Sequence, residues 1–124
     1  MKKIEAIIRK TKFEEVKEAL IEADIEWFSY MDIRGVGKSR QERIYRGVIY
    51  DTSSIERILL TIVVRTINAE KTINAILKSA YTGEIGDGRI FVSEVLESYR
   101  IRTHSSGDET LYNPEGTRNE SQKK

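Results

Sequence analysis

Hydrophobic and polar positions along the chain follow two periods, which together predict six secondary-structure elements. Apolar and polar residues alternate, with the period of a β-strand, in four segments: 3–9, 27–33, 57–65 and 90–96. Between the first two strands, and again between the last two, apolar residues recur every three to four positions, as on the buried face of a helix. The first helix is predicted to begin at a capping box formed by Thr11 and Glu14, and the second at an Asn68 cap.

The order strand, helix, strand, strand, helix, strand predicts a ferredoxin-like α+β sandwich. Two successive βαβ units of this kind form a four-stranded antiparallel sheet with two helices on one face. Residues 57–65 are apolar on both faces, which predicts a central strand that is covered on both sides. The face away from the helices carries Ile7 and Val63, which are too apolar to remain in water. We therefore expect the chain to form an oligomer through this face.

Three segments fall outside this pattern. Residues 38–54 form a long, basic loop between the second and third strands, in which Tyr45–Tyr50 can pair locally as a hairpin arm. Residues 99–102 are predicted as a short fifth strand. Residues 105–124 are polar, with Leu111 as their one aliphatic residue, and are predicted to be a disordered tail after a domain of residues 1–104.

Composition narrows the function classes. The 124 residues carry a net charge of +1, which gives no argument for binding nucleic acid. Cysteine is absent and the single histidine, His104, lies in a polar loop sequence, so we expect neither a metal site nor a catalytic residue. No apolar run reaches the roughly 18 residues of a membrane span, and no secretory signal precedes the first strand. Composition therefore disfavours hydrolytic and metal enzymes, and the absence of cysteine fits a reducing cytoplasm.

Two glycine-rich turns and a pair of arginines are candidates for an anion site. Segment 82–89 lies between a helix and a strand, segment 35–38 follows a strand, and Arg100 and Arg102 share one face of the chain. Glycine lets backbone amides approach an anion closely, so together these elements indicate a polyphosphate site. Ordinary turns and solvated arginines are the alternative, because neither turn matches the Walker or Rossmann fingerprint.

Four dispersed segments resemble the PII signal-transduction proteins, the nitrogen-status sensors. The opening residues 1–8 are similar to the start of that family, and Tyr45-Arg46-Gly47 with Tyr50 resembles its T-loop, here about residues 37–55. Residues 82–89 resemble its B-loop, and Arg100-Ile101-Arg102-Thr103 its C-loop, about residues 99–104. The resemblance extends from Met1 to about Thr103 with one gap, in the T-loop.

The resemblance implies a homotrimer in which ATP and ADP compete for three clefts between subunits. The residues that match the family's phosphate contacts come from the T-loop base, the B-loop and the neighbouring subunit's C-loop: Gly35, Val36, Gly37, Lys38, Gly86, Asp87, Gly88, Arg89, Arg100 and Arg102. Those that match its adenine contacts are Ser29, Thr61 and Val63.

Several positions depart from the family pattern. Ser39 replaces the glutamine that helps hold the Mg²⁺ ion between ATP and 2-oxoglutarate, and Thr61 replaces an acidic residue near the adenine. Arg57 and Arg89 replace lysines, which keeps the charge but changes its geometry. We therefore expect ATP or ADP to bind, with Mg²⁺ accompanying ATP, and 2-oxoglutarate not to bind in the family's usual manner.

The same resemblance implies a cytoplasmic, non-enzymatic regulator whose most frequent target is an ammonium transporter. The family's extended T-loop places an arginine in the transporter's cytoplasmic pore exit, and Arg46 matches that arginine. Such a protein is recruited to the inner face of the membrane by its target. Tyr50 matches the tyrosine that is uridylylated in the family, with an unmodified loop tyrosine as the alternative.

Three other functions remain open from the sequence. The chain can be a PII-like regulator of a different enzyme or transporter that does not sense 2-oxoglutarate. A small nucleotide phosphatase would need a nucleophile or base beside the glycine turns, which the sequence does not offer. An RNA-binding module is disfavoured by the net charge and by the lack of a stacking motif on a strand.

Overall fold

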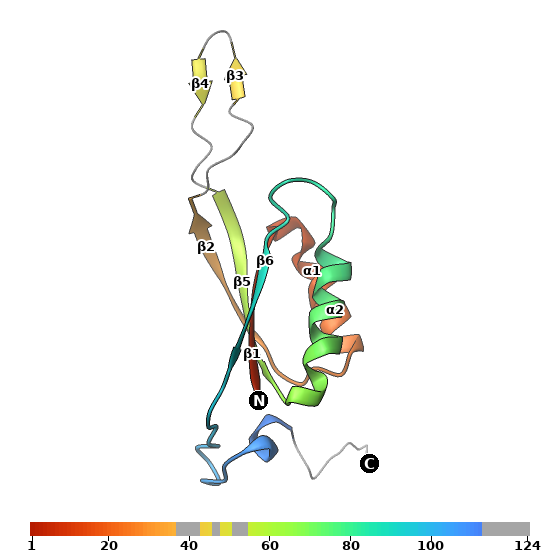
Figure 1. Cartoon of the computed structure of the whole chain (residues 1–124), viewed down its shortest axis with the longest axis vertical. Coiled ribbons are helices and arrows are strands. Elements are labelled where there is room, and N and C mark those ends of the chain that lie inside the picture. The colour runs from red at the N-terminus through yellow and green to blue at the C-terminus, as the bar shows by residue number, and fades with distance from the viewer. Residues whose placement is uncertain (37–42, 46–47, 51–54, 113–124) are drawn as a thin grey trace.

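The computed structural model describes residues 1–36, 43–45, 48–50 and 55–112 (Figure 1). Its strands and α-helices follow the predicted order: β1 (Lys2–Ile8), α1 (Phe13–Glu22), β2 (Ser29–Gly35), β3 (Arg43–Tyr45), β4 (Val48–Tyr50), β5 (Ile55–Val64), α2 (Ala69–Ala80) and β6 (Arg89–Glu94). Three short 3₁₀ turns complete the described chain: η1 (Lys10–Lys12), η2 (Thr66–Asn68) and η3 (Asp108–Leu111).

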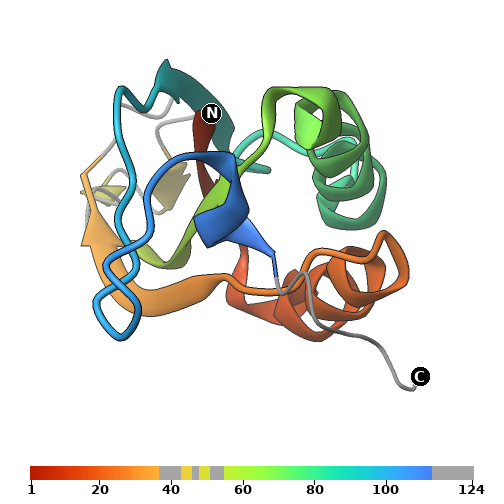
Figure 2. The ribbon, with the colours of Figure 1, turned by 90° about the horizontal axis from the view of Figure 1, so that it is seen from below.

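Four strands form one antiparallel sheet in the order β2-β5-β1-β6. Both helices lie on the same face of this sheet, so the molecule has two layers, which the view from below shows side by side (Figures 1 and 2). The predicted α+β class and the four-stranded antiparallel sheet are confirmed, and the topology is consistent with a ferredoxin-like fold.

The hydrophobic core lies between the sheet and the helices. From Ile4 onward in β1 and from Ile58 onward in β5, every second residue is buried there, because the two-residue period of a strand sends alternate side chains to one face. Val16 and Leu20 of α1 and Ile76 of α2 fill the other side of the layer. Each such side chain, fully buried, contributes about 1.5–3 kcal/mol relative to exposure. The one buried polar residue of the described chain, Thr72, donates its hydroxyl hydrogen to the Asn68 carbonyl at 2.7 Å.

Both helices begin differently from the prediction. A 3₁₀ turn precedes each one, so the N-cap residues Lys12 and Asn68 already have helical backbone angles and make no side-chain cap bond. A capping side chain requires an extended backbone at its own residue, which the 3₁₀ turns remove. The capping box of Thr11 and Glu14 is therefore wrong, while Asn68 has the predicted position without the predicted hydrogen bond.

The second face of the sheet is not covered by the helices. Ile7 and Val63 are partly exposed there, and Met31 and Phe91, which alternate onto the same face, are 57% and 51% exposed. Strand β5 lies inside the sheet, as predicted for a central strand. The sequence also predicts that the second face of β5 is covered. This part stays a prediction, because another subunit of an oligomer would have to provide the cover.

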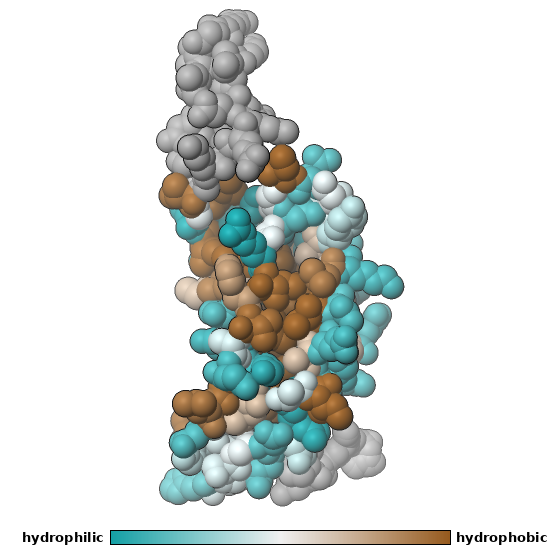
Figure 3. Space-filling model, in the orientation of Figure 1, coloured by the Kyte–Doolittle hydropathy of each residue, from teal (hydrophilic) through white to brown (hydrophobic). Residues whose placement is uncertain are grey.

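A second apolar surface lies between α2 and the edge strand β6. Figure 3 shows hydrophobic side chains gathered over this part of the molecule. They line a groove of about 400 Å³ that includes Ile73, Leu77, Ile90 and Val92. A single chain thus leaves apolar surface exposed in two places, which favours association.

The segment that the resemblance predicts to be a T-loop is described only in part. Strands β3 and β4 pair with each other as a separate two-stranded sheet, with Ile44 opposite Ile49, so the predicted local hairpin is confirmed for these residues. The predicted site residues Gly37, Lys38 and Arg46 lie outside the described residues.

The C-terminal region differs from both predictions made for it. Residues 99–102 are not a strand, because Tyr99 makes only an isolated bridge to Ser106 and a turn follows. Residues 105–112 are not a disordered tail but an ordered segment that includes η3. Backbone hydrogen bonds hold it, from Arg100 N to the Ser105 carbonyl at 2.9 Å and from Gly107 N to the Ser98 carbonyl at 2.9 Å. Hydrogen bonds between polar residues give no hydropathy pattern, so the sequence did not predict this ordered segment. Residues 113–124 lie outside the described residues.

No helix of the described residues is long and apolar enough to cross a membrane.

Candidate functional site

Asp87 builds the B-loop between α2 and β6. Its carboxylate accepts hydrogen bonds from the backbone amides of Thr82 at 2.8 Å and Gly83 at 2.9 Å, and from the Thr82 hydroxyl. It also accepts one from Nε of Arg9 at 3.0 Å. The Thr82 hydroxyl, the backbone amides and Arg9 all stabilise the charged form, so they hold the pKa of Asp87 well below its ordinary value of 3.8. Any contact of Asp87 with phosphate, which stays a prediction, would have to come from its backbone.

Replacing Asp87 tests this role. Asp87→Asn should lower the thermal midpoint of unfolding at pH 7, because the amide keeps the shape but loses the charge that Arg9 and the backbone amides stabilise. The folded-state pKa is depressed, so the stabilisation is fully present above pH 3.8 and is lost as the pH falls below that value. Thermal unfolding followed by circular dichroism should therefore show a difference between the two proteins that shrinks below pH 3.8.

Asp24→Asn is the matched control, because Asp24 is exposed. Its backbone is left-handed (φ 62°), a conformation that asparagine tolerates as well as aspartate does. A difference between wild type and Asp87→Asn that is the same at every pH would contradict the role of the Asp87 charge.

Two arginines from the sheet hold the rest of the B-loop. Arg9, directly after β1, donates to the Ile85 carbonyl at 3.0 Å, and Arg57 of β5 donates to the Gly86 carbonyl at 3.1 Å. Burial, and then the positive charge of Arg9, lower the pKa of Arg57 from its ordinary value, while Asp87 acts in the opposite sense. The sequence analysis did not include Arg9 in the site. The signal was present, because the alternation that places Ile7 on the face away from the helices also places Arg9 there.

Two glycines shape the loop where it meets the sheet. Gly86 has φ +101°, and a Cβ atom there would lie 3.2 Å from the Arg57 guanidinium. Gly88 has φ +112°, and a Cβ atom there would lie 1.8 Å from the Ile7 carbonyl oxygen. Arg89 follows as the first residue of β6, is exposed, and makes no ion pair with any residue in the described ranges. Three guanidinium groups thus belong to the B-loop and its supports, an arrangement that can bind a multiply charged anion.

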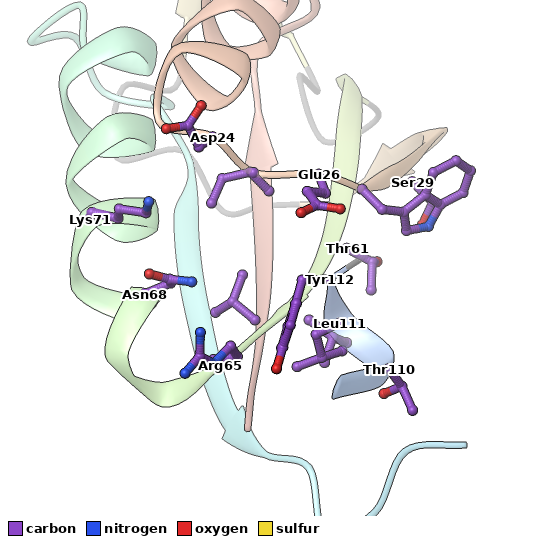
Figure 4. Close-up of a pocket in the computed structure, with 14 residues that line it drawn as sticks. Asp24, Glu26, Ser29, Thr61, Arg65, Asn68, Lys71, Thr110, Leu111 and Tyr112 are labelled. Carbon is purple, nitrogen blue, oxygen red and sulfur yellow. The ribbon is translucent and has the colours of Figure 1, made fainter. Parts of the chain in front are cut away.

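A cavity of about 540 Å³ lies at the other end of the same sheet (Figure 4). The three residues that match the family's adenine contacts, Ser29, Thr61 and Val63, all line it. Their side chains come together because Ser29 of β2 pairs with Thr61 of β5, and Val63 is the next residue of β5 on that face. The cavity also includes two residues that the sequence did not indicate, Arg65 and Tyr112.

Strand β5 connects the cavity to the B-loop. Arg57, Thr61 and Val63 alternate onto the same face of this strand. Thr61 is four positions after Arg57, which corresponds to about 13 Å along a strand. That span is of the same order as the length of an extended nucleoside triphosphate.

The remaining predicted residues lie at both ends of the molecule. Gly35 pairs with Ile55 at the B-loop end of the sheet, and Val36 follows it. Arg100 and Arg102 belong to the segment after β6, which lies at the opposite end of the molecule from the loop between α2 and β6 (Figure 1). A single chain therefore does not bring these two arginines to Arg89.

The chain is similar to known proteins over most of its length. The family model described as nitrogen regulatory protein P-II matches residues 1–105. The nitrogen regulatory protein P-II of Rhizobium meliloti is 44% identical over 108 residues, which are 86% of this chain and 96% of the relative. That of Bradyrhizobium diazoefficiens is 43% identical over the same shares. Nitrogen regulatory protein P-II 1 of Methanothermobacter thermautotrophicus is 40% identical over 112 residues, 90% of this chain and 97% of the relative.

Proposed function

Because this chain belongs to the nitrogen regulatory protein P-II family, whose members are signal transducers, we propose that it binds ATP or ADP between the subunits of a homotrimer and regulates a target through its T-loop. The observation that carries this proposal is the arrangement on β5. A cavity lined by Ser29, Thr61 and Val63 and the arginine-supported B-loop lie along one face of one strand. The base would occupy the cavity and the phosphates would reach the B-loop.

The trimer supplies what one chain lacks. Arg100 and Arg102 reach the phosphates only if the C-terminal end of a neighbouring subunit lies against the B-loop end of this one. The apolar sheet face around Ile7 and Val63 gives the subunits a surface for that association. Mg²⁺ would accompany ATP on its phosphates. Ser39 in place of glutamine argues against 2-oxoglutarate as a second ligand.

Regulation fits the site better than hydrolysis. The carboxylate next to the arginines, Asp87, already accepts hydrogen bonds from Thr82, Gly83 and Arg9. A carboxylate with a depressed pKa and four donors is a poor general base, because its lone pairs are occupied and its basicity is low. We therefore propose a nucleotide-dependent switch and not a phosphatase.

The target we propose is an ammonium transporter, contacted by Arg46 of the T-loop, with a different enzyme or transporter as the alternative. The protein would act in the cytoplasm and be recruited to the inner face of the membrane by this target. Nucleotide exchange would bias the T-loop between conformations that bind the target differently.

Calorimetric titration with ATP and ADP tests nucleotide binding. Wild-type protein should bind both, and addition of 2-oxoglutarate with Mg²⁺ should change the affinities little. Arg89→Ala should weaken both nucleotides roughly ten- to hundredfold, because it removes a charge-assisted hydrogen bond to phosphate. Lys78→Ala removes the same charge from an exposed position on α2 and should leave binding unchanged. Equal affinities of wild type and Arg89→Ala would contradict the phosphate site, and strong enhancement by 2-oxoglutarate would contradict the argument from Ser39.

A further inference from the structure

The segment after the C-loop forms part of the cavity that we assign to the base. We call residues 106–112 the C-terminal strap; they lie beyond residue 105, where the family match ends. Thr110, Leu111 and Tyr112 of the strap line the cavity together with Ser29, Thr61 and Val63. The walls of this cavity therefore come from the sheet on one side and from the strap on the other.

Two arginines hold the strap in place. One amino group of Arg100 donates to the carbonyls of Glu109 at 3.1 Å and Tyr112 at 2.8 Å. The guanidinium of Arg65 lies over the Tyr112 ring, 5.2 Å from its centroid, and 3.8 Å from the Asp108 carboxylate. The Thr110 hydroxyl adds a hydrogen bond to that of Ser98 at 2.5 Å. A short polar segment with this many anchors is a fixed wall and not a frayed terminus.

Tyr112 is oriented for contact with a planar ligand. Figure 4 shows its ring edge-on, with Arg65 on one side and Leu111, and farther away Thr61, on the other. The arginine over one face fixes the ring, because a cation is attracted to the face of an aromatic ring. On the other side of the ring, Leu111 and Thr61 line the cavity together with Tyr112.

From this geometry we propose that Tyr112 is a specificity-determining residue for the base of the bound nucleotide, with Arg65 and Arg100 as its positioning residues. The inference rests on the proposed function, because it assigns the cavity to the base. A base that occupies the cavity contacts the Tyr112 ring, whereas the phosphates, at the B-loop end of the sheet, never touch the strap. Arg100 can hold the strap of its own chain and still contact the phosphates in a neighbouring subunit's site, because a guanidinium has five donors and the two strap carbonyls use two of them.

Two probes and three variants of the full chain separate this role from a structural one. ATP carries a base and inorganic tripolyphosphate does not, so only ATP should respond to a change at Tyr112. Tyr112→Ala should weaken ATP binding about 5- to 50-fold in calorimetric titration, the size expected for loss of one stacking contact. It should leave tripolyphosphate binding within twofold. Tyr112→Phe keeps the ring and should bind ATP as wild type does.

Tyr99→Ala is the matched control, because Tyr99 is 64% exposed, does not line the cavity, and bridges Ser106 through its backbone alone. Circular dichroism should show the same fold for all variants. The inference is overturned if Tyr112→Ala binds ATP as tightly as wild type, or more tightly, as a strap that blocks the cavity would cause. Equal loss of ATP and tripolyphosphate would also overturn it, since the strap would then act on the phosphate end. Wild type that binds tripolyphosphate but not ATP would refute the base site alone. Wild type that binds neither would refute the proposed function itself.

Discussion

Gly88→Ala should lower the free energy of unfolding by about 2–5 kcal/mol. An alanine with φ near +112° costs about 1–2 kcal/mol, and its Cβ atom would have to displace the Ile7 carbonyl oxygen, at 1.8 Å, for about 1–3 kcal/mol more. Domains have a total stability of about 5–15 kcal/mol, so this single methyl group would remove a large part of it. Urea unfolding followed by circular dichroism measures the change, at one fixed protein concentration because the protein is expected to be an oligomer.

Gly35→Ala is the matched control for this prediction. A Cβ atom at Gly35 meets no atom within 4 Å, and the backbone there is not left-handed, so the variant should unfold within about 0.5 kcal/mol of wild type. If Gly88→Ala unfolds like Gly35→Ala, then the close approach of the B-loop to β1 is not a requirement of the fold.

Arg46→Ala should reduce co-purification with an ammonium transporter to background. A buried arginine at the centre of a small interface commonly contributes 2 kcal/mol or more, about thirtyfold in affinity, and three such losses in one trimer would multiply. The measurement is retention of the purified protein on transporter-containing membranes, with ATP and with ADP. The wild-type complex should form with one nucleotide and dissociate with the other, because equal binding in both states would transmit no signal.

Arg43→Ala removes the same charge from the same hairpin and should keep most of the binding. Both variants should still bind ATP and remain trimers, with about three times the 14.3 kDa chain mass by light scattering. An Arg46→Ala protein that still binds the transporter and blocks ammonium uptake would contradict the proposed anchor. If wild type binds no ammonium transporter with either nucleotide, the T-loop serves a different target.

Periodicity was enough to predict the sheet, the helices and their order. Strand β5 is the clearest case, because its alternation of Ile58, Leu60 and Ile62 directly gives the residues that are buried. The helix starts were less predictable. A capping pattern at Thr11 does not show that a 3₁₀ turn will bring the backbone into helical angles before the helix begins.

The sequence predicted many residues of the candidate site but not the contacts between them. The glycines and arginines were visible in the sequence, and pairing of β2 with β5 brings Ser29 and Thr61 together. The role of Asp87 as hydrogen-bond acceptor for Thr82 and Arg9 could not be predicted, because these contacts depend on how the loop and the end of β1 meet in space. Tyr112 was missed for the same reason, since a ring held by Arg65 looks in the sequence like any tyrosine in a polar tail.

The alternation along β5 also limits how this family can vary by insertion and deletion. Arg57, Thr61 and Val63 face the same way only because their sequence positions differ by even numbers. One residue gained or lost between Arg57 and Thr61 would turn the arginine toward the helices and break the register with β1 and β2. In the T-loop, no even spacing of this kind is required, and a one-residue change in loop length costs little entropy. We therefore expect length changes to be accepted before Ile55 and not within the strand, so that the loop can change its contacts while the proposed nucleotide site keeps its geometry.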